Sequence, residues 1–167
     1  MLAIAAAGSF IARADEKLPA FVMPKTSQLK VVGEIRPREP VNFSGQERIA
    51  GDLLAEWEPG ESGEVEPSYL IVPDAPSAAR LPHFKGYGIS VIDVSNGEET
   101  LAMMLGDDQA RQLLSDRHMK RVLVHGAFVI TDYEMTIECD SPWARARVIS
   151  AERPRGPPDA PGSQERC

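Results

Sequence analysis

The chain has 167 residues, which is enough for one ordinary domain with tails that buries a core without disulfides or metals. Its hydrophobic fraction of 43% and charged fraction of 26% exclude a chain too polar to fold. A net charge of −7 opposes non-specific binding to nucleic acid or anionic lipid, because Lys and Arg make the phosphate contacts.

The first fourteen residues predict a signal peptide. Leu2 to Ala12 is apolar, Ala12-Arg13-Ala14 matches an A-x-A cleavage site, and a polar segment begins at Asp15. No basic residue precedes Leu2, so an apolar strand or helix packed on the domain remains the alternative. The run is too short to cross a hydrocarbon core of ~30 Å, so we expect no transmembrane anchor. We expect a periplasmic or secreted chain whose net charge becomes −8, because cleavage removes Arg13.

The next elements are a polar lead-in and two strand candidates. Residues 15–28 form the lead-in, and Leu29 to Arg36 alternates as a strand does, with Gly33 indicating a bend. Ser44 to Trp57 fits either a short helix or a strand. Ser68 to Val72 is a short apolar strand candidate before Pro73.

An Asn-Gly pair predicts a hairpin in the middle of the chain. Tyr87–Val94 and Thr100–Leu105 flank Asn96-Gly97, and Asn-Gly between apolar runs is a strong hairpin signal. A helix is then expected from Asp107 or Asp108 to about Met119.

Strict alternation predicts a second hairpin. Val122–Ile130 and Met135–Cys139 alternate on either side of a turn at Thr131–Tyr133, and Trp143–Ile149 is a last strand. The outward side chains of that strand are expected to pair across strands, with Arg145 and Arg147 opposite Glu134 and Glu138.

Three strands, one helix and two strands form the element order of an OB-fold, a five-stranded barrel with one helix. The run Lys120-Arg121-Val122-Leu123-Val124-His125-Gly126-Ala127-Phe128 resembles the fourth strand of OB domains, and the pattern is similar to that of uncharacterised exported bacterial OB-type domains. The resemblance covers residues 29–150 and implies one mainly β domain. An α+β antiparallel meander or half-open sandwich is the alternative.

The C-terminal residues 151–167 are rich in Pro, Gly and charge and predict a disordered tail. The two cysteines, Cys139 and Cys167, can pair in an oxidising compartment or stay separate, and the sequence leaves both open.

One irregular segment has the composition of a binding site. It contains His83, Phe84, Lys85 and Tyr87 between glycines, and aromatic side chains at the end of an OB barrel can stack on a flat ligand. The alternative is that Phe84 and Tyr87 plug the barrel end.

A second candidate is a basic patch that could receive an acidic partner. It comprises Arg111, Arg117, Lys120 and Arg121, with His118 nearby. Such residues also complement the dipole at a helix C-terminus. No spacing predicts a metal site, a nucleophile or a phosphate loop, so no cofactor and no catalytic residue is assigned.

These features predict an exported, non-enzymatic binding module for a partner protein or small ligand, expected to be a monomer. One alternative is a single-stranded nucleic-acid binder, although an acidic chain does not favour it. The other alternative is a hydrolase with carboxylates brought together by the fold.

Overall fold

The computed structural model describes residues 20–36, 39–59, 65–116, 119–138, 141–153 and 164–166. The expected signal peptide at residues 1–14, Cys139 and Cys167 lie outside these ranges. The strands are β1 (Phe21–Val22), β2 (Lys30–Val32), β3 (Val41–Ser44), β4 (Glu47–Pro59), β5 (Val65–Pro73), β6 (His83–Phe84), β7 (Ile92–Val94), β8 (Met119–Glu138), β9 (Ser141–Glu152) and β10 (Gln164–Arg166). The helices are α1 (Ala75–Ala78), α2 (Gly97–Leu105) and α3 (Asp107–Ser115). The prediction of a mainly β fold is confirmed.

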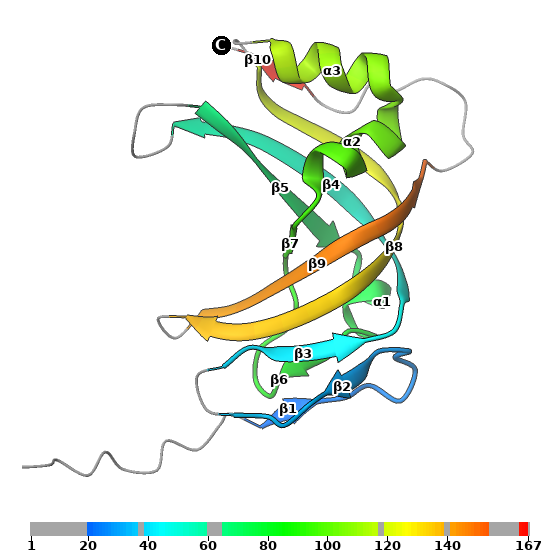
Figure 1. The fold of residues 1–167 in the computed structure, drawn as a ribbon, viewed down its shortest axis with the longest axis vertical. Helices are drawn as coiled ribbons and strands as arrows, with labels where there is room; N and C mark the ends of the chain where they lie inside the picture. Colours follow the sequence, from blue (N-terminus) through cyan, green and yellow to red (C-terminus); the bar gives the residue numbers. More distant parts are fainter. Residues whose placement is uncertain are drawn as a thin grey trace, which may run out of the picture.

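Five of the strands close into a ring (Figure 1). The main sheet has the order β2-β3-β8-β4-β5-β7-β9, and β9 pairs back onto β8, so β8, β4, β5, β7 and β9 form the ring. All neighbours in the ring are antiparallel except β7 and β9, which run parallel. β10 pairs with β8, and β1 and β6 form a separate two-stranded sheet.

The core fills this ring because alternate side chains of each strand point inward. Ile49 and Leu53 of β4, Ile71 of β5 and Phe128 of β8 are at most 1% exposed. Tyr133 is also fully buried, and its hydroxyl donates to the carbonyl oxygen of Pro82 at 3.0 Å. Its one polar group is therefore satisfied inside the core.

The segment that was open to two interpretations, Ser44–Trp57, contains no helix: Ser44 ends β3, and β4 begins at Glu47 and runs through Trp57. Gly51 lies at its centre, where β5 comes so close that a Cβ atom would lie 2.2 Å from the carbonyl oxygen of Val72 and 2.8 Å from the Cα of Pro73. The strand at Leu29–Arg36 is shorter than expected and covers only Lys30–Val32, because Gly33 adopts a positive φ of 77° and ends it.

The predicted strand at Thr100–Leu105 is wrong, because this segment belongs to α2. Leu, Ala and Met are good helix formers, and the segment has no β-branched residue after Thr100. Asn96 starts the helix, and its carbonyl accepts from the Thr100 backbone N–H at 3.0 Å. The described residues form three helices where the sequence predicted one. Two of them, α2 and α3, are separated at Gly106 (φ 86°).

The predicted turn at Thr131–Tyr133 is also wrong. β8 runs through it, and the register against β9 shifts between Thr131 and Glu134 while Asp132 takes a φ of 50°. This is a bulge, in which extra residues bend a strand without ending it. The hairpin forms later, between Glu138 and Ser141.

The last strand is longer than Trp143–Ile149, since β9 covers Ser141–Glu152. Arg145 lies opposite Glu134 as expected, but its Nε binds Asp93 Oδ2 at 2.7 Å. Arg147 lies opposite Thr131 and approaches Glu99 at 3.8 Å. Within the expected tail, residues 151–152 extend β9 and 164–166 form β10; residues 154–163 and 167 lie outside the described residues.

Replacing Gly51 with Ala should destabilise the fold. The new Cβ would meet backbone atoms of β5, which move only if the two strands separate, and overpacking of this kind costs about 1–3 kcal/mol. Urea unfolding measures the change. Gly88→Ala is the matched control, because nothing lies within 4 Å of its Cβ position. Equal stability of the two variants would contradict the close approach of β4 and β5.

Candidate functional site

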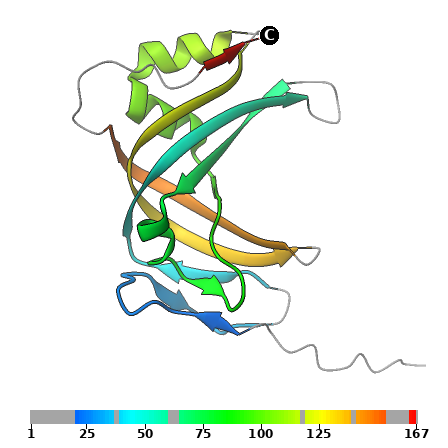
Figure 2. The same ribbon diagram turned by 180° about the vertical axis from the view of Figure 1, so that it is seen from behind.

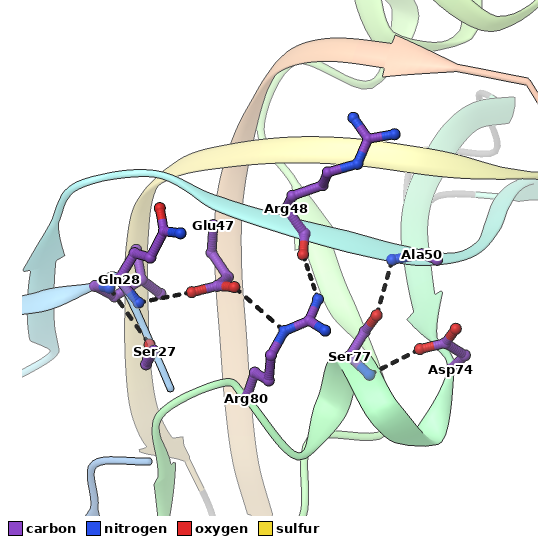
Figure 3. A network of polar contacts seen from close by, with 9 residues as sticks. Ser27, Gln28, Glu47, Arg48, Ala50, Asp74, Ser77 and Arg80 are labelled. Atoms are coloured by element: carbon purple, nitrogen blue, oxygen red, sulfur yellow. Dashed lines mark hydrogen bonds and ion pairs between the residues drawn. The ribbon is translucent and has the colours of Figure 1, made fainter. Parts of the chain in front are cut away.

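An open hollow of about 430 Å³ lies beside α1, at the beginning of β4. Three segments supply its polar groups: residues 26–28 of the lead-in, the beginning of β4 at Glu47–Ala50, and the α1 region with Asp74, Ser77 and Arg80; Ala127 of β8 completes the lining. Figure 3 shows the polar network that joins them. This polar pocket is within the size range of small-ligand sites.

A buried carboxylate anchors the pocket. Glu47 is 3% exposed, and its Oε2 accepts from the backbone N–H of Gln28 at 2.8 Å. Its Oε1 lies 3.4 Å from Nε of Arg80, whose Nη2 donates to the carbonyl of Arg48 (Figure 3). A buried charge requires such partners, since removing it from water is costly. Glu47 therefore fixes the position of the Arg80 guanidinium.

A second network fixes α1 against β4. Asp74 precedes the helix and its Oδ1 accepts from the Ser77 backbone N–H at 2.8 Å, as an N-cap residue does. The Ser77 hydroxyl accepts from the Ala50 backbone N–H at 2.8 Å, and the Asp74 N–H donates to the Ala50 carbonyl at 2.9 Å. Hydrogen bonds from Ser77 lower the pKa of Asp74, with smaller contributions from the charges of Arg80 and His125. Asp74 is thus held as a carboxylate at neutral pH.

The pocket therefore carries opposite charges on its α1 side. The side chain of Arg80 is 37% exposed, and no interaction of the described residues engages its Nη1. Asp74 is half-buried at the other end of α1. Arg48 turns its side chain away from this network in Figure 3 and binds Glu152 at 3.2 Å. The charged groups available to a ligand are the Arg80 cation and the Asp74 anion.

The residues predicted as a site from the sequence do not line this pocket. Phe84 is 4% exposed and belongs to the core, and His83 places Nδ1 2.9 Å from the carbonyl of Leu81. Lys85 and Tyr87 are exposed, with Tyr87 at 41%. Lys85 and Tyr87 are therefore the exposed two of the four, and His83 is half-buried.

The predicted basic patch is partly neutralised. Arg111 lies 3.2 Å from Asp108, and Nε of Arg121 donates to Glu56 Oε1 at 2.7 Å. Lys120 is exposed. Arg117 and His118 lie outside the described residues.

The polar pocket was not predicted from the sequence, although the sequence contains two indications of it. Glu47 precedes Ile49, Gly51 and Leu53 at every second position, so a strand interpretation of this segment would have placed a carboxylate facing inward. Asp74 two residues before Pro76 is typical of a helix start.

Two kinds of site are absent from the part of the chain that the structure describes. No cluster of three His, Cys, Asp or Glu side chains there could hold a metal ion. None of the described helices combines the length and apolar character needed to span a membrane. Comparisons of the chain with protein families, with curated proteins and with solved structures find no match.

The buried carboxylate should matter more than an exposed one. Glu47→Gln removes the charge that faces Arg80 and should lower the free energy of unfolding by about 1–3 kcal/mol, the usual contribution of a hydrogen bond to a charged group. Glu152→Gln makes the same change at a side chain that is 65% exposed and should change stability by less than about 1 kcal/mol. Urea unfolding of both variants measures this, and an equal loss would refute the anchoring role of Glu47.

The capping role of Asp74 should depend on pH. Its pKa is lowered in the folded state, so it stabilises the fold above its unfolded pKa of about 3.9, and this contribution is lost as pH falls through the folded value. Asp74→Ala should therefore be less stable than wild type at neutral pH, with a smaller difference in strong acid. Urea midpoints across this range measure the effect, and a difference that is constant with pH would contradict it.

Proposed function

We propose that the chain is an exported, non-enzymatic binding module with an OB-like fold that holds a small zwitterion, such as a free amino acid, in the polar pocket. The observation that carries this proposal is the buried Glu47, which positions the Arg80 guanidinium at the wall of an open hollow. A binding site needs recognition groups that are held in place before the ligand arrives.

The order of the strands supports the OB-like assignment. Along the chain β4, β5 and β7 come first, α2 and α3 follow, and β8 and β9 come last. In the ring β4 lies between β5 and β8, and β7 lies between β5 and β9. Five strands in a partly open Greek-key ring with a helical segment between the third and fourth are the features of an OB-fold.

The charges of the pocket support a ligand that carries both signs. A carboxylate would bind Nη1 of Arg80, and an ammonium group would bind the Asp74 carboxylate. Glu47 already offsets the Arg80 charge in part, which disfavours a ligand with several negative charges. The net charge of the chain, −7, also disfavours such a ligand.

Export is proposed from the N-terminal sequence. The apolar run Leu2–Ala12 and the motif Ala12-Arg13-Ala14 are typical of a signal peptide and its cleavage site.

The test is calorimetric titration of the full chain with each of the free amino acids. We expect at least one to bind the wild type, and we expect Asp74→Asn to weaken that affinity by about tenfold or more, or about 1.4 kcal/mol. Asn keeps the capping oxygen and removes the charge, so the variant should remain folded. An N-acetylated form of the same amino acid should also bind the wild type more weakly, because it lacks the ammonium group.

Asp132→Asn is the matched control, since it makes the same change at an exposed residue of β8 that does not line the pocket. Asn tolerates the positive φ at this position. The proposal fails if no amino acid binds the wild type. It also fails if Asp74→Asn, with an unchanged urea midpoint, binds as tightly as wild type.

A further inference from the structure

Three leucines form a row on the outward face of the ring. Leu70 of β5 lies opposite Leu54 of β4, which lies opposite Leu123 of β8. All three are half-buried, while Leu53 and Ile71, which precede and follow them in their strands, are fully buried in the core. In Figure 2, β4 and β5 cross in front of the ring and neither α2 nor α3 lies over them. The row is an apolar strip on a sheet face that α2 and α3 leave open.

A pair of polar side chains flanks the row on each side, a carboxylate with an imidazole on one side and an ion pair on the other. Asp52 of β4 lies opposite His125 of β8 with 2.8 Å between Oδ1 and Nδ1. Glu56 of β4 lies opposite Arg121 of β8 with 2.7 Å between Oε1 and Nε. On both sides the acidic residue belongs to β4 and the basic residue to β8. We call this surface the leucine face, comprising Asp52, Leu54, Glu56, Leu70, Arg121, Leu123 and His125.

We propose that the leucine face binds a second copy of this chain in a two-fold symmetric dimer. The two-fold axis lies between the copies, parallel to the strands and directly above the line along which β4 and β8 pair. Rotation about this axis places β4 of each copy over β8 of the other. Leu54 then packs over the second copy's Leu123, and every symmetric contact occurs twice. Sheets that pack face to face in this way lie ≈ 10 Å apart.

The arrangement of charge selects a second copy over other partners. Under this axis Asp52 lies over the His125 position and Glu56 over the Arg121 position of the other copy, so one flanking row places a carboxylate over a hydrogen-bonding imidazole and the other places opposite charges together. These side chains keep exposed fractions of 39% for Asp52, 58% for His125, 23% for Glu56 and 43% for Arg121, which leaves surface for a second contact. Complementary charges mainly give an interface its specificity and register, and the leucines supply the apolar centre.

The first test is the oligomeric state of the full chain, measured by sedimentation equilibrium over a range of concentrations. We expect a monomer–dimer equilibrium for the wild type. Leu54→Gln should raise the dissociation constant by about tenfold or more without lowering the urea midpoint, because Leu54 lies outside the core. Ile149→Gln is the matched control: Ile149 is 39% exposed on β9, outside the leucine face, and its variant should dimerise like wild type.

The second test exchanges the charges of one row. The double variant Glu56→Arg with Arg121→Glu keeps the ion pair within each chain and also keeps opposite signs across a dimer of two variant chains. In a mixed dimer, however, Glu56 of wild type would face the new Glu at position 121. We therefore expect the variant to dimerise with itself and to exclude tagged wild-type chains in an exchange experiment.

Three results would overturn the proposal. The first is a wild type that stays monomeric at every concentration, and the second is free mixing of wild-type and double-variant chains. The third is a loss of dimer in Ile149→Gln equal to that in Leu54→Gln, which would place the contact elsewhere on the ring.

Discussion

The ring depends on β8 pairing along both of its edges. One edge pairs with β4 from Arg121 to Ile130, and the other pairs with β9 from Ala127 to Glu138. β8 also curves along its length (Figure 1), and the bulge near Asp132 contributes to this bend. The same bend directs Tyr133 into the core, where its hydroxyl finds the Pro82 carbonyl. The closed core, the polar pocket and the leucine face all lie on strands that this one strand holds together.

The fold was predictable where a local pattern had one meaning. Strict alternation identified Val122–Ile130 as a strand, because a helix would expose half of those apolar side chains. The bulge at Thr131–Tyr133 was mistaken for a turn, since a polar residue that tolerates positive φ is common to both. At Asn96-Gly97 the hairpin signal outweighed the helix-forming residues that follow. In the structure Asn96 begins α2, and its side chain is bound to Val148 of β9, far away in the sequence.

The polar pocket was not predictable for a different reason. Its groups come from three separated segments, and their convergence depends on α1 lying on β4 through Ser77 and Ala50. Composition alone pointed to the segment of His83 to Tyr87, which is rich in aromatic and basic residues. The direction of a side chain in an irregular segment depends on packing, and Phe84 turns into the core while Tyr87 faces solvent.

The join between β7 and β9 depends on one side chain from outside the two strands. Two residue pairs connect these strands, and the Asn96 side chain extends the join by donating to the Val148 carbonyl at 2.8 Å and accepting from the Val148 N–H at 2.9 Å. One amide can make both hydrogen bonds because it carries a donor and an acceptor. A carboxylate at this position would keep the acceptor and lose the donor, so the closure of the ring depends on the chemical identity of a single polar side chain as well as on its apolar core.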